Sequence, residues 1–151
     1  IIYINYIYYI MIIYIIFIIR LFEIISSIIR NINRQKTFNE PYLKSIELNK
    51  PLLIIGDPYN GFMGKYFPTY PCGDVCLDLN GCDKCSQRIQ GDAYEELKKM
   101  KQGEYIIFES CVLEYIENND LVMKEIKRVS NHTSYHVRFG LTLLNFGFYP
   151  G

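Results

Sequence analysis

The segment PLLIIGD, residues 51–57, decides the fold that we expect for this chain. It is a short apolar run that ends at a turn signal, and polar and apolar residues do not alternate within it. A run of this kind is typical of a parallel strand that is buried on both faces. The segment therefore predicts an α/β domain with a largely parallel sheet.

Strand-like and helical segments alternate along the rest of the chain, which predicts βαβ units and a mostly parallel sheet. A parallel sheet of this class binds its ligands at the carboxyl ends of its strands. In the helix expected at 118–130, the apolar spacing turns Leu121, Ile126 and Val129 toward the core. We expect strands at 74–79, 104–110, 134–140 and 141–149, helices at 92–100 and 118–130, and at most a short helix at 61–67.

The N-terminal segment, residues 1–19, contains no charged side chain. As a helix it would rise about 28 Å, close to the hydrocarbon thickness of a bilayer. We therefore predict a membrane-anchor helix over residues 1–30, with residues 1–19 in contact with lipid and the remainder as an amphipathic extension. Ile and Tyr also have high β-propensity, so a buried strand, an aggregation-prone segment or a merely biased composition is the alternative.

The charge pattern suggests an orientation for the rest of the chain. Basic residues follow the apolar segment, at Arg20, Arg30, Arg34 and Lys36. This excess favours the cytoplasmic side for what comes after: a linker over 31–50, with a polar connector at 37–50, and an α/β domain over 51–151. The whole chain has 16 basic and 16 acidic residues, a balance that gives no electrostatic indication of nucleic-acid binding.

Two acidic residues stand at the expected carboxyl ends of the first two strands. Asp57 precedes a tight turn through Asn60 and Gly61, whose backbone N–H groups can approach a ligand closely. Asp78 lies 21 residues further on, a separation that suits hydrogen bonds to ribose hydroxyls. Capping of the turn that follows it explains Asp78 equally well.

Other candidates at the strand and helix ends have simple structural explanations. Asp92 opens the helix at 92–100, where an N-cap role accounts for it. Ser110 and Cys111 end the strand at 104–110, above the expected cleft, and tight packing is the alternative for both. Because Cys111 lies in an apolar run, we expect a buried, inert thiol. His132 and His136 fall around an expected strand, and we interpret both as exposed side chains.

The order of these motifs resembles that of the class I S-adenosylmethionine-dependent methyltransferases over residues 51–140. LLIIGDPYNG resembles the first strand and glycine loop of the family, and VCLDL the second strand with its ribose-binding acid, Asp78. IQGDAYEEL is similar to the adenine-side segment, with Asp92 before a short helix. YIIFESCVLEYIEN resembles the fourth strand and the segment after it, and LVMKEIKRVS a later helix of the family.

The resemblance implies a Rossmann-like sheet of the methyltransferase type that binds S-adenosylmethionine (SAM). Asp78 would hold the ribose, the loop from Gly56 to Gly61 the methionine end, and Asp92 the adenine side. Methyl transfer needs an aligned nucleophile and the exclusion of water rather than a fixed catalytic side chain, so catalytic residues and methyl acceptor stay unknown. The expected cofactor-binding set is Gly56, Asp57, Asn60, Gly61, Asp78, Asp92 and Ser110.

Four of the five cysteines lie within fourteen residues, at Cys72, Cys76, Cys82 and Cys85. The last two have the C-x-x-C spacing of a zinc knuckle, and the first two would complete a tetrahedral zinc site. A disulfide or redox pair, or simple packing, are the alternatives. The odd number and the clustering argue against a secreted disulfide framework and favour a reducing compartment.

Two functions follow from these expectations. The first is a SAM-dependent methyltransferase-like domain tethered to a membrane. The second is a non-catalytic scaffold module with a degenerate methyltransferase fold and a structural zinc. The retained acids favour the first function. The second is favoured by the glycine loop, where only Gly56 and Gly61 remain of the family's G-x-G-x-G pattern.

Overall fold

The chain divides into two units between Asn33 and Arg34. The computed structural model describes residues 2–60, 64 and 66–137. Helix α1, Ile2–Leu48, begins in the first unit and ends in the second. The strand expected at 141–149 and most of the helix expected at 61–67 lie outside the described residues.

In the first unit, α1 exposes large apolar side chains from Tyr8 to Ile32. The helix from Tyr8 to Leu48 contains an 18-residue window with a mean hydropathy of 2.4, and is long and apolar enough to cross a membrane by length and composition. The N-terminal apolar helix is thus confirmed. The alternative of a buried strand is wrong for this segment.

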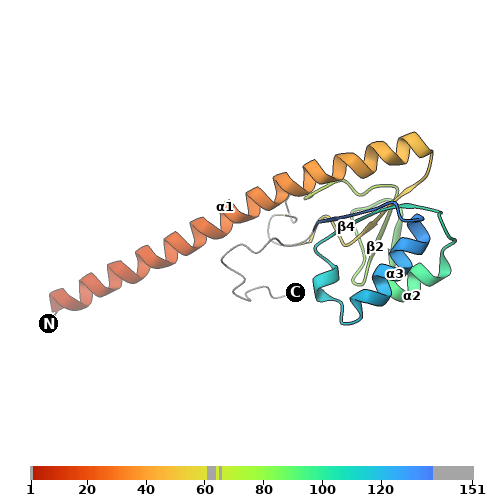
Figure 1. The fold of residues 1–151 in the computed structure, drawn as a ribbon. Coiled ribbons are helices and arrows are strands. Elements are labelled where there is room, and N and C mark those ends of the chain that lie inside the picture. The colour runs from red at the N-terminus through yellow and green to blue at the C-terminus, as the bar shows by residue number, and fades with distance from the viewer. Residues whose placement is uncertain (1, 61–63, 65, 138–151) are drawn as a thin grey trace. The chain divides into compact units, whose positions relative to one another are not determined.

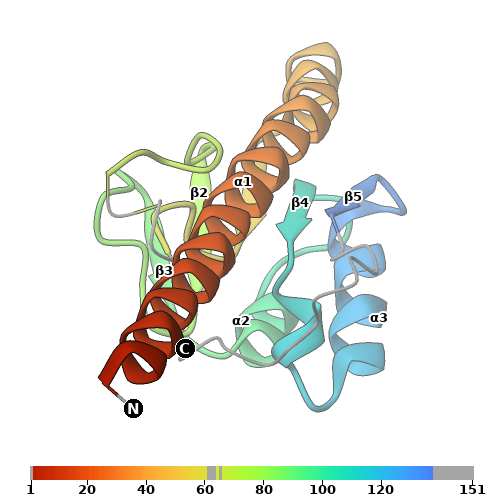
Figure 2. The same cartoon turned by 90° about the vertical axis from the view of Figure 1, so that its left-hand side faces the viewer.

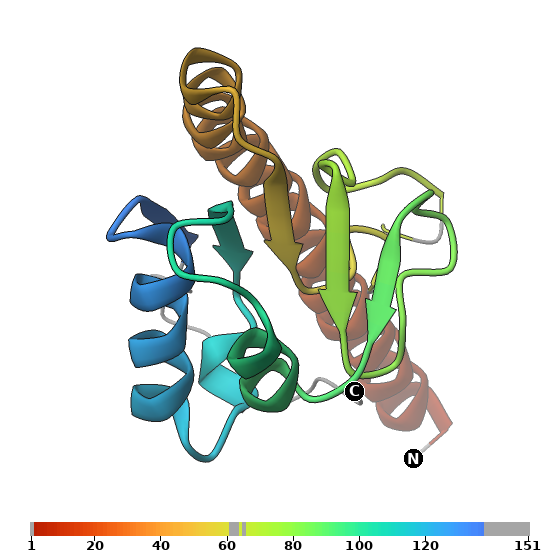
Figure 3. The same cartoon turned by 90° about the vertical axis from the view of Figure 1, so that its right-hand side faces the viewer.

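The second unit is built on a five-stranded sheet in the order β3-β2-β1-β4-β5, with every neighbouring pair parallel. The order reverses between β1 and β4, because successive strands are added outward on either side of β1. Figure 3 shows the arrowheads of the sheet pointing to one edge, called here the carboxyl edge. The strands are β1 Leu52–Ile55, β2 Val75–Asp78, β3 Arg88–Gln90, β4 Ile106–Ser110 and β5 Ser134–Val137.

The expected α/β class with a parallel sheet is confirmed, and β3 is an addition to it. Residues 88–90 fall between the expected strand at 74–79 and the expected helix at 92–100, where we predicted no strand. The segment is only three residues long and lies at the edge of the sheet, so its burial pattern is weak and carries no strand signal. Backbone pairing with β2 makes it a strand.

The side chains of β1 alternate between two hydrophobic cores. Leu53 and Ile55 pack toward α2, Ala93–Lys99, and α3, Asn119–Ser130. Leu52 and Ile54 pack on the opposite face, against the end of α1. Figures 1 and 2 show the sheet between these layers. Because both faces are covered, β1 is apolar throughout, as a buried parallel strand must be.

Helix α3 confirms the expected element but corrects one of its core positions. Ile126 and Val129 are buried as expected, whereas Leu121 is 46% exposed and Val122 is buried in its place. The Arg128 guanidinium of α3 donates hydrogen bonds to the Leu97 and Met100 carbonyls at 2.8 and 2.9 Å. These carbonyls lie at the end of α2, where carbonyl groups lack their usual helical partners, and the Leu97 carbonyl also accepts from the Met100 N–H at 3.1 Å.

The polar connector expected at 37–50 is wrong, because α1 continues through it to Leu48. Phe38, Pro41 and Ser45 are buried along one side of this part of the helix, at a spacing that brings them to one face. Phe38 packs edge-on against Phe108 of β4, with ring centroids 5.3 Å apart. This part of α1 has few apolar residues, so packing against the sheet stabilises its helical conformation, although Pro41 removes one backbone hydrogen bond.

Candidate functional site

Gly56 joins β1 to its loop at the point where the strand order reverses. Its φ of +103° is a conformation that L side chains rarely adopt, and an added Cβ would collide with the Val112 side chain. The Gly56 N–H donates to the Leu77 carbonyl at 2.8 Å, and the Tyr70 hydroxyl donates to the Gly56 carbonyl at 3.2 Å. Burial raises the pKa of Tyr70, which keeps this hydroxyl protonated as a donor.

The two acids expected at the strand ends are brought together. The Asp57 N–H donates to Oδ2 of Asp78 at 3.1 Å, and the Asn80 N–H donates to Oδ1 of Asp78 at 2.8 Å. Capping of the turn after β2 is therefore confirmed for Asp78. Each carboxylate oxygen has a second lone pair, so both can also accept from a ligand hydroxyl.

The side chain of Asp57 lies in a partly buried and negatively charged environment. Burial is the largest influence and raises the pKa of Asp57, and the nearby charges of Asp78 and Asp83 also raise it. A hydrogen bond from the Tyr59 N–H to Oδ1, at 3.0 Å, and the charge of Lys84 lower it in part. A concentration of carboxylates at this edge suits a cationic ligand group.

Asp92 is the N-cap of α2, as expected. Its Oδ1 accepts from the Glu95 N–H at 3.1 Å, and the residue is exposed. The preceding residue, Gly91, donates its N–H to the Asp78 carbonyl at 3.1 Å. Asp92 therefore follows directly on a segment tied to Asp78, at the carboxyl edge.

The end of β4 lies beside Gly56. Ser110 is 5% exposed, and Cys111 is a buried free thiol with a positive φ of 58°. The Cys111 N–H donates to the Val137 carbonyl at 2.8 Å. The expected burial of Cys111 is confirmed. Asn60 donates its N–H to the Asp57 carbonyl at 3.1 Å, and Gly61 lies outside the described residues.

Glu109 of β4 is the residue that sequence reasoning missed. It is fully buried, and its Oε1 accepts from the Val112 and Leu113 N–H groups at 2.6 and 3.1 Å. Its Oε2 lies 3.5 Å from Nδ1 of His136 and has no hydrogen-bond partner. The signal in the sequence was an ionisable residue inside the otherwise apolar run IIFES.

His136 corrects an expectation. Its side chain is 20% exposed rather than fully exposed, because the register of β5 against β4 sets it opposite Glu109. Its Nε2 lies 3.0 Å from the Ser134 hydroxyl. His132 is exposed as expected.

The four clustered cysteines form two disulfides, Cys72–Cys85 and Cys76–Cys82. The disulfide alternative thus holds in this structure, against the expectation of unpaired thiols in a reducing compartment. A disulfide sulfur is not a thiolate ligand, so a zinc site on these cysteines requires reduction of both bridges. Among the described residues, no group of three or more His, Cys, Asp or Glu side chains is placed to hold a metal ion.

The Cys76–Cys82 bridge also constrains the candidate site. It spans the end of β2 and the turn after it, a segment that contains Asp78. Cys76 and Cys82 are both fully buried, and they pack with Cys85 in one cluster that also contacts Tyr59. The position of the Asp78 carboxylate is therefore fixed by a covalent loop as well as by its hydrogen bonds.

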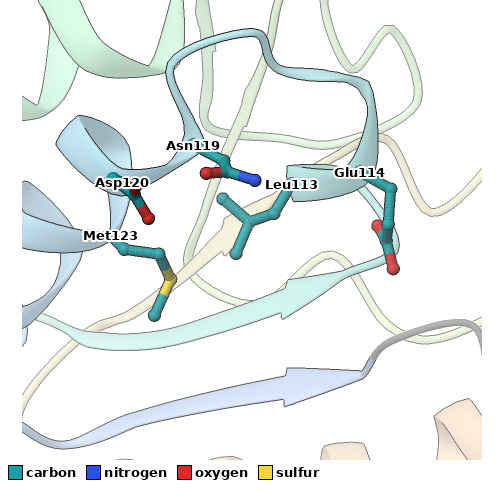
Figure 4. Close-up of a pocket in the computed structure, with 5 residues that line it drawn as sticks. All are labelled: Leu113, Glu114, Asn119, Asp120 and Met123. Carbon is teal, nitrogen blue, oxygen red and sulfur yellow. The ribbon is translucent and has the colours of Figure 1, made fainter.

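A hollow of about 190 Å³ lies between the 3₁₀ turn η1, Leu113–Tyr115, and the first turns of α3. Figure 4 shows the residues that line it, the apolar Leu113 and Met123 and the polar Glu114, Asn119 and Asp120. The hollow follows the end of β4 in the chain, but none of the expected cofactor-binding residues that the structure describes lines it. It is smaller than the clefts that usually hold a cofactor.

Comparison with protein families, with curated proteins and with solved structures finds no match to this chain.

Proposed function

We propose that the second unit is a SAM-binding domain of the methyltransferase kind, tethered to a membrane by the apolar part of α1. The observation that carries this proposal is the meeting of Gly56, Asp57 and Asp78 at the reversal of strand order. Doubly wound sheets with this order bind nucleotide ligands at that point. The resemblance of residues 51–140 to the methyltransferases supports the same position.

The side chains at the carboxyl edge suit two chemical groups of SAM, the ribose and the sulfonium. Asp78 has acceptor capacity left for ribose hydroxyls, and the carboxylates around Asp57 complement a sulfonium cation. The methyl acceptor is not identified by any side chain. The transfer itself depends on alignment and the exclusion of water, which the loops over the carboxyl edge would provide.

Substitution of Asp78 tests cofactor binding. In the full chain reconstituted in nanodiscs, we expect Asp78→Asn to weaken SAM binding about tenfold or more, because a charge-assisted hydrogen bond is worth about 1.5–3 kcal/mol. The measurement is isothermal titration calorimetry. Asp74→Asn is the matched control: Asp74 stands at the other end of β2, where its Oδ2 accepts from the Leu52 N–H at 2.7 Å.

The two variants separate a ligand role from a structural one. Loss of SAM binding in Asp78→Asn with retention in Asp74→Asn supports the proposal. Absence of SAM binding by the unsubstituted chain at millimolar concentration would contradict it.

The second candidate is a non-catalytic scaffold, and the two backbone hydrogen bonds that give Asp78 a structural role favour it. In this function, a zinc ion bound by the reduced cysteines would stabilise the module. The cysteines already gather in one cluster. Elemental analysis of the reduced chain distinguishes this candidate, since it predicts one zinc per chain and no SAM binding.

A further inference from the structure

Outside α1, the large apolar side chains that the described residues expose lie on segments that follow strand ends at the carboxyl edge. They come from four separate segments: the β1–β2 connection, the turn after β2, η1 after β4, and the first turn of α3. These side chains, with their exposed fractions, are Tyr66 (68%), Phe67 (67%), Leu79 (66%), Tyr115 (66%) and Leu121 (46%). The Thr69 N–H donates to the Pro58 carbonyl at 2.9 Å, which ties the β1–β2 connection back to the end of β1. Several apolar side chains gathered at one edge indicate a contact surface, whereas isolated ones do not.

The opposite edge of the sheet, called here the amino edge, is where the strands begin, and its connections expose polar side chains. The connection before β4 exposes Lys101 and Gln102, and the connection before β5 exposes Asn131 and His132. Figure 3 shows these connections at the end of the sheet away from the arrowheads. Outside α1, apolar exposure thus distinguishes the two edges of the sheet, whereas the end of α1 itself exposes Ile46 (61%) and Leu48 (41%).

Within the second unit, α1 runs from the side of the carboxyl edge to the opposite, amino edge. The Lys50 ammonium, just after α1, donates to the Gly103 carbonyl at 2.7 Å, so α1 ends at the amino edge. Earlier in α1, Phe38 stacks with Tyr70, whose hydroxyl binds the carbonyl of Gly56 at the end of β1. This part of α1 therefore runs antiparallel to β1, and its first residues lie toward the carboxyl edge.

We propose that the carboxyl edge is a membrane-contacting surface, with Phe67 and Tyr115 inserted at the boundary of lipid headgroups and acyl chains. The apolar part of α1 directly precedes the residues that lie toward this edge. Tyr and Phe side chains suit the interface, because an aromatic body and a polar tip fit its two environments. Glu114, Glu117 and Asp120 flank Tyr115, so the surface favours zwitterionic over anionic lipid.

The proposal rests on the membrane-tether part of the proposed function and not on SAM binding. The chain contains no Trp, so a single introduced Trp is a unique fluorescent probe. We would prepare Phe67→Trp, Tyr115→Trp, Gln102→Trp and Ile15→Trp in the full chain. Each is reconstituted in phosphatidylcholine vesicles with or without bromine on the acyl chains, which quenches Trp on contact.

We expect brominated lipid to reduce the emission of Phe67→Trp and Tyr115→Trp by about half, and that of Gln102→Trp hardly at all. Ile15→Trp, on the apolar part of α1, reports whether the tether itself holds. Quenching at Ile15→Trp without quenching at either edge position would overturn the inference and leave the tether intact. Equal quenching at Gln102→Trp would also overturn it, and no quenching at Ile15→Trp would overturn the tether together with the inference.

Discussion

At the residue scale, Gly56 combines an unusual backbone conformation with close packing. Gly81 has nearly the same φ, +93°, but the nearest atom to an added Cβ there lies 3.6 Å away, in ordinary contact. We expect Gly81→Ala to cost about 1–2 kcal/mol through its backbone alone. Gly56→Ala should cost about 1–3 kcal/mol more, because its Cβ also collides with Val112.

The free energy of unfolding of the full chain in detergent, measured by urea titration, checks this prediction. Val112→Ala in the Gly56→Ala background removes the colliding atoms and should restore part of the loss. Equal destabilisation by the two glycine substitutions would show that the contact with Val112 has no cost.

The raised pKa of Asp57 predicts how the stability of the fold depends on pH. Its raised pKa means that the folded state binds the proton more readily than the unfolded state, whose ordinary value is 3.8. The stabilisation from protonated Asp57 is therefore present below about pH 3.8 and is lost as pH rises through the folded pKa. We expect Asp57→Asn to raise the thermal midpoint at pH 7 and to leave it unchanged at pH 3, since Asn still accepts from the Tyr59 N–H.

Circular dichroism melts at a series of pH values measure this difference. Glu117→Gln, in an exposed loop, is the control that removes a negative charge without removing a buried carboxylate. An Asp57→Asn variant less stable than the unsubstituted chain at pH 7 would refute the assignment.

At the scale of elements, Glu109 holds the connection from β4 to η1. Glu109→Ala leaves the Val112 and Leu113 N–H groups without their acceptor, and each such loss costs about 1–3 kcal/mol. We expect at least about 2 kcal/mol of destabilisation by urea unfolding. Glu109→Gln keeps one acceptor oxygen and should lose clearly less; an equal loss in both variants would show that the negative charge, not the acceptor, is required.

The same connection shows why this part of the site was not predicted. A carboxylate at the end of an apolar strand has no partner visible in the sequence. The fold supplies the backbone N–H groups of the next turn and, through the pairing of β4 with β5, the His136 ring. Strand register decides that partnership, and register depends on the whole sheet.

At the scale of the whole molecule, the disulfides and the basic residues after the apolar segment point to different compartments. Basic flanking residues favour a cytoplasmic domain, whereas disulfides persist in oxidising compartments. The cytoplasmic position that the basic residues favour predicts that all four clustered cysteines are reduced in the cell. Rapid alkylation of cell extracts followed by mass spectrometry should then find labels on Cys72, Cys76, Cys82 and Cys85.

Cys111 is the internal control, because it is a free thiol in either compartment and labels only after unfolding. Intact Cys72–Cys85 and Cys76–Cys82 bridges under these conditions would place the domain in an oxidising compartment. Such bridges would also exclude the zinc alternative in that state, since a disulfide offers no thiolate.

The sequence by itself determined the central elements: the strands β1, β2 and β4, the helices α2 and α3, the Asp92 cap and the apolar helix at the N-terminus. These depend on local signals, such as uninterrupted apolar runs, helical spacing and capping residues, which do not need the fold to be recognised. Burial of Cys111 followed from its apolar neighbours in the same way.

Only the tertiary structure decided the order of the strands, the helical continuation of α1 over 37–48, the strand β3, the pairing of the cysteines and the contact of Glu109 with His136. Each depends on residues distant in the chain: β3 on its neighbour β2, and Phe38 on the core under Phe108. The segment PLLIIGD, residues 51–57, shows both the local signal and the effect of the tertiary structure. Its apolar residues predict a buried strand, but its position beside both β2 and β4 brings Asp57 to Asp78 and makes its end the candidate site.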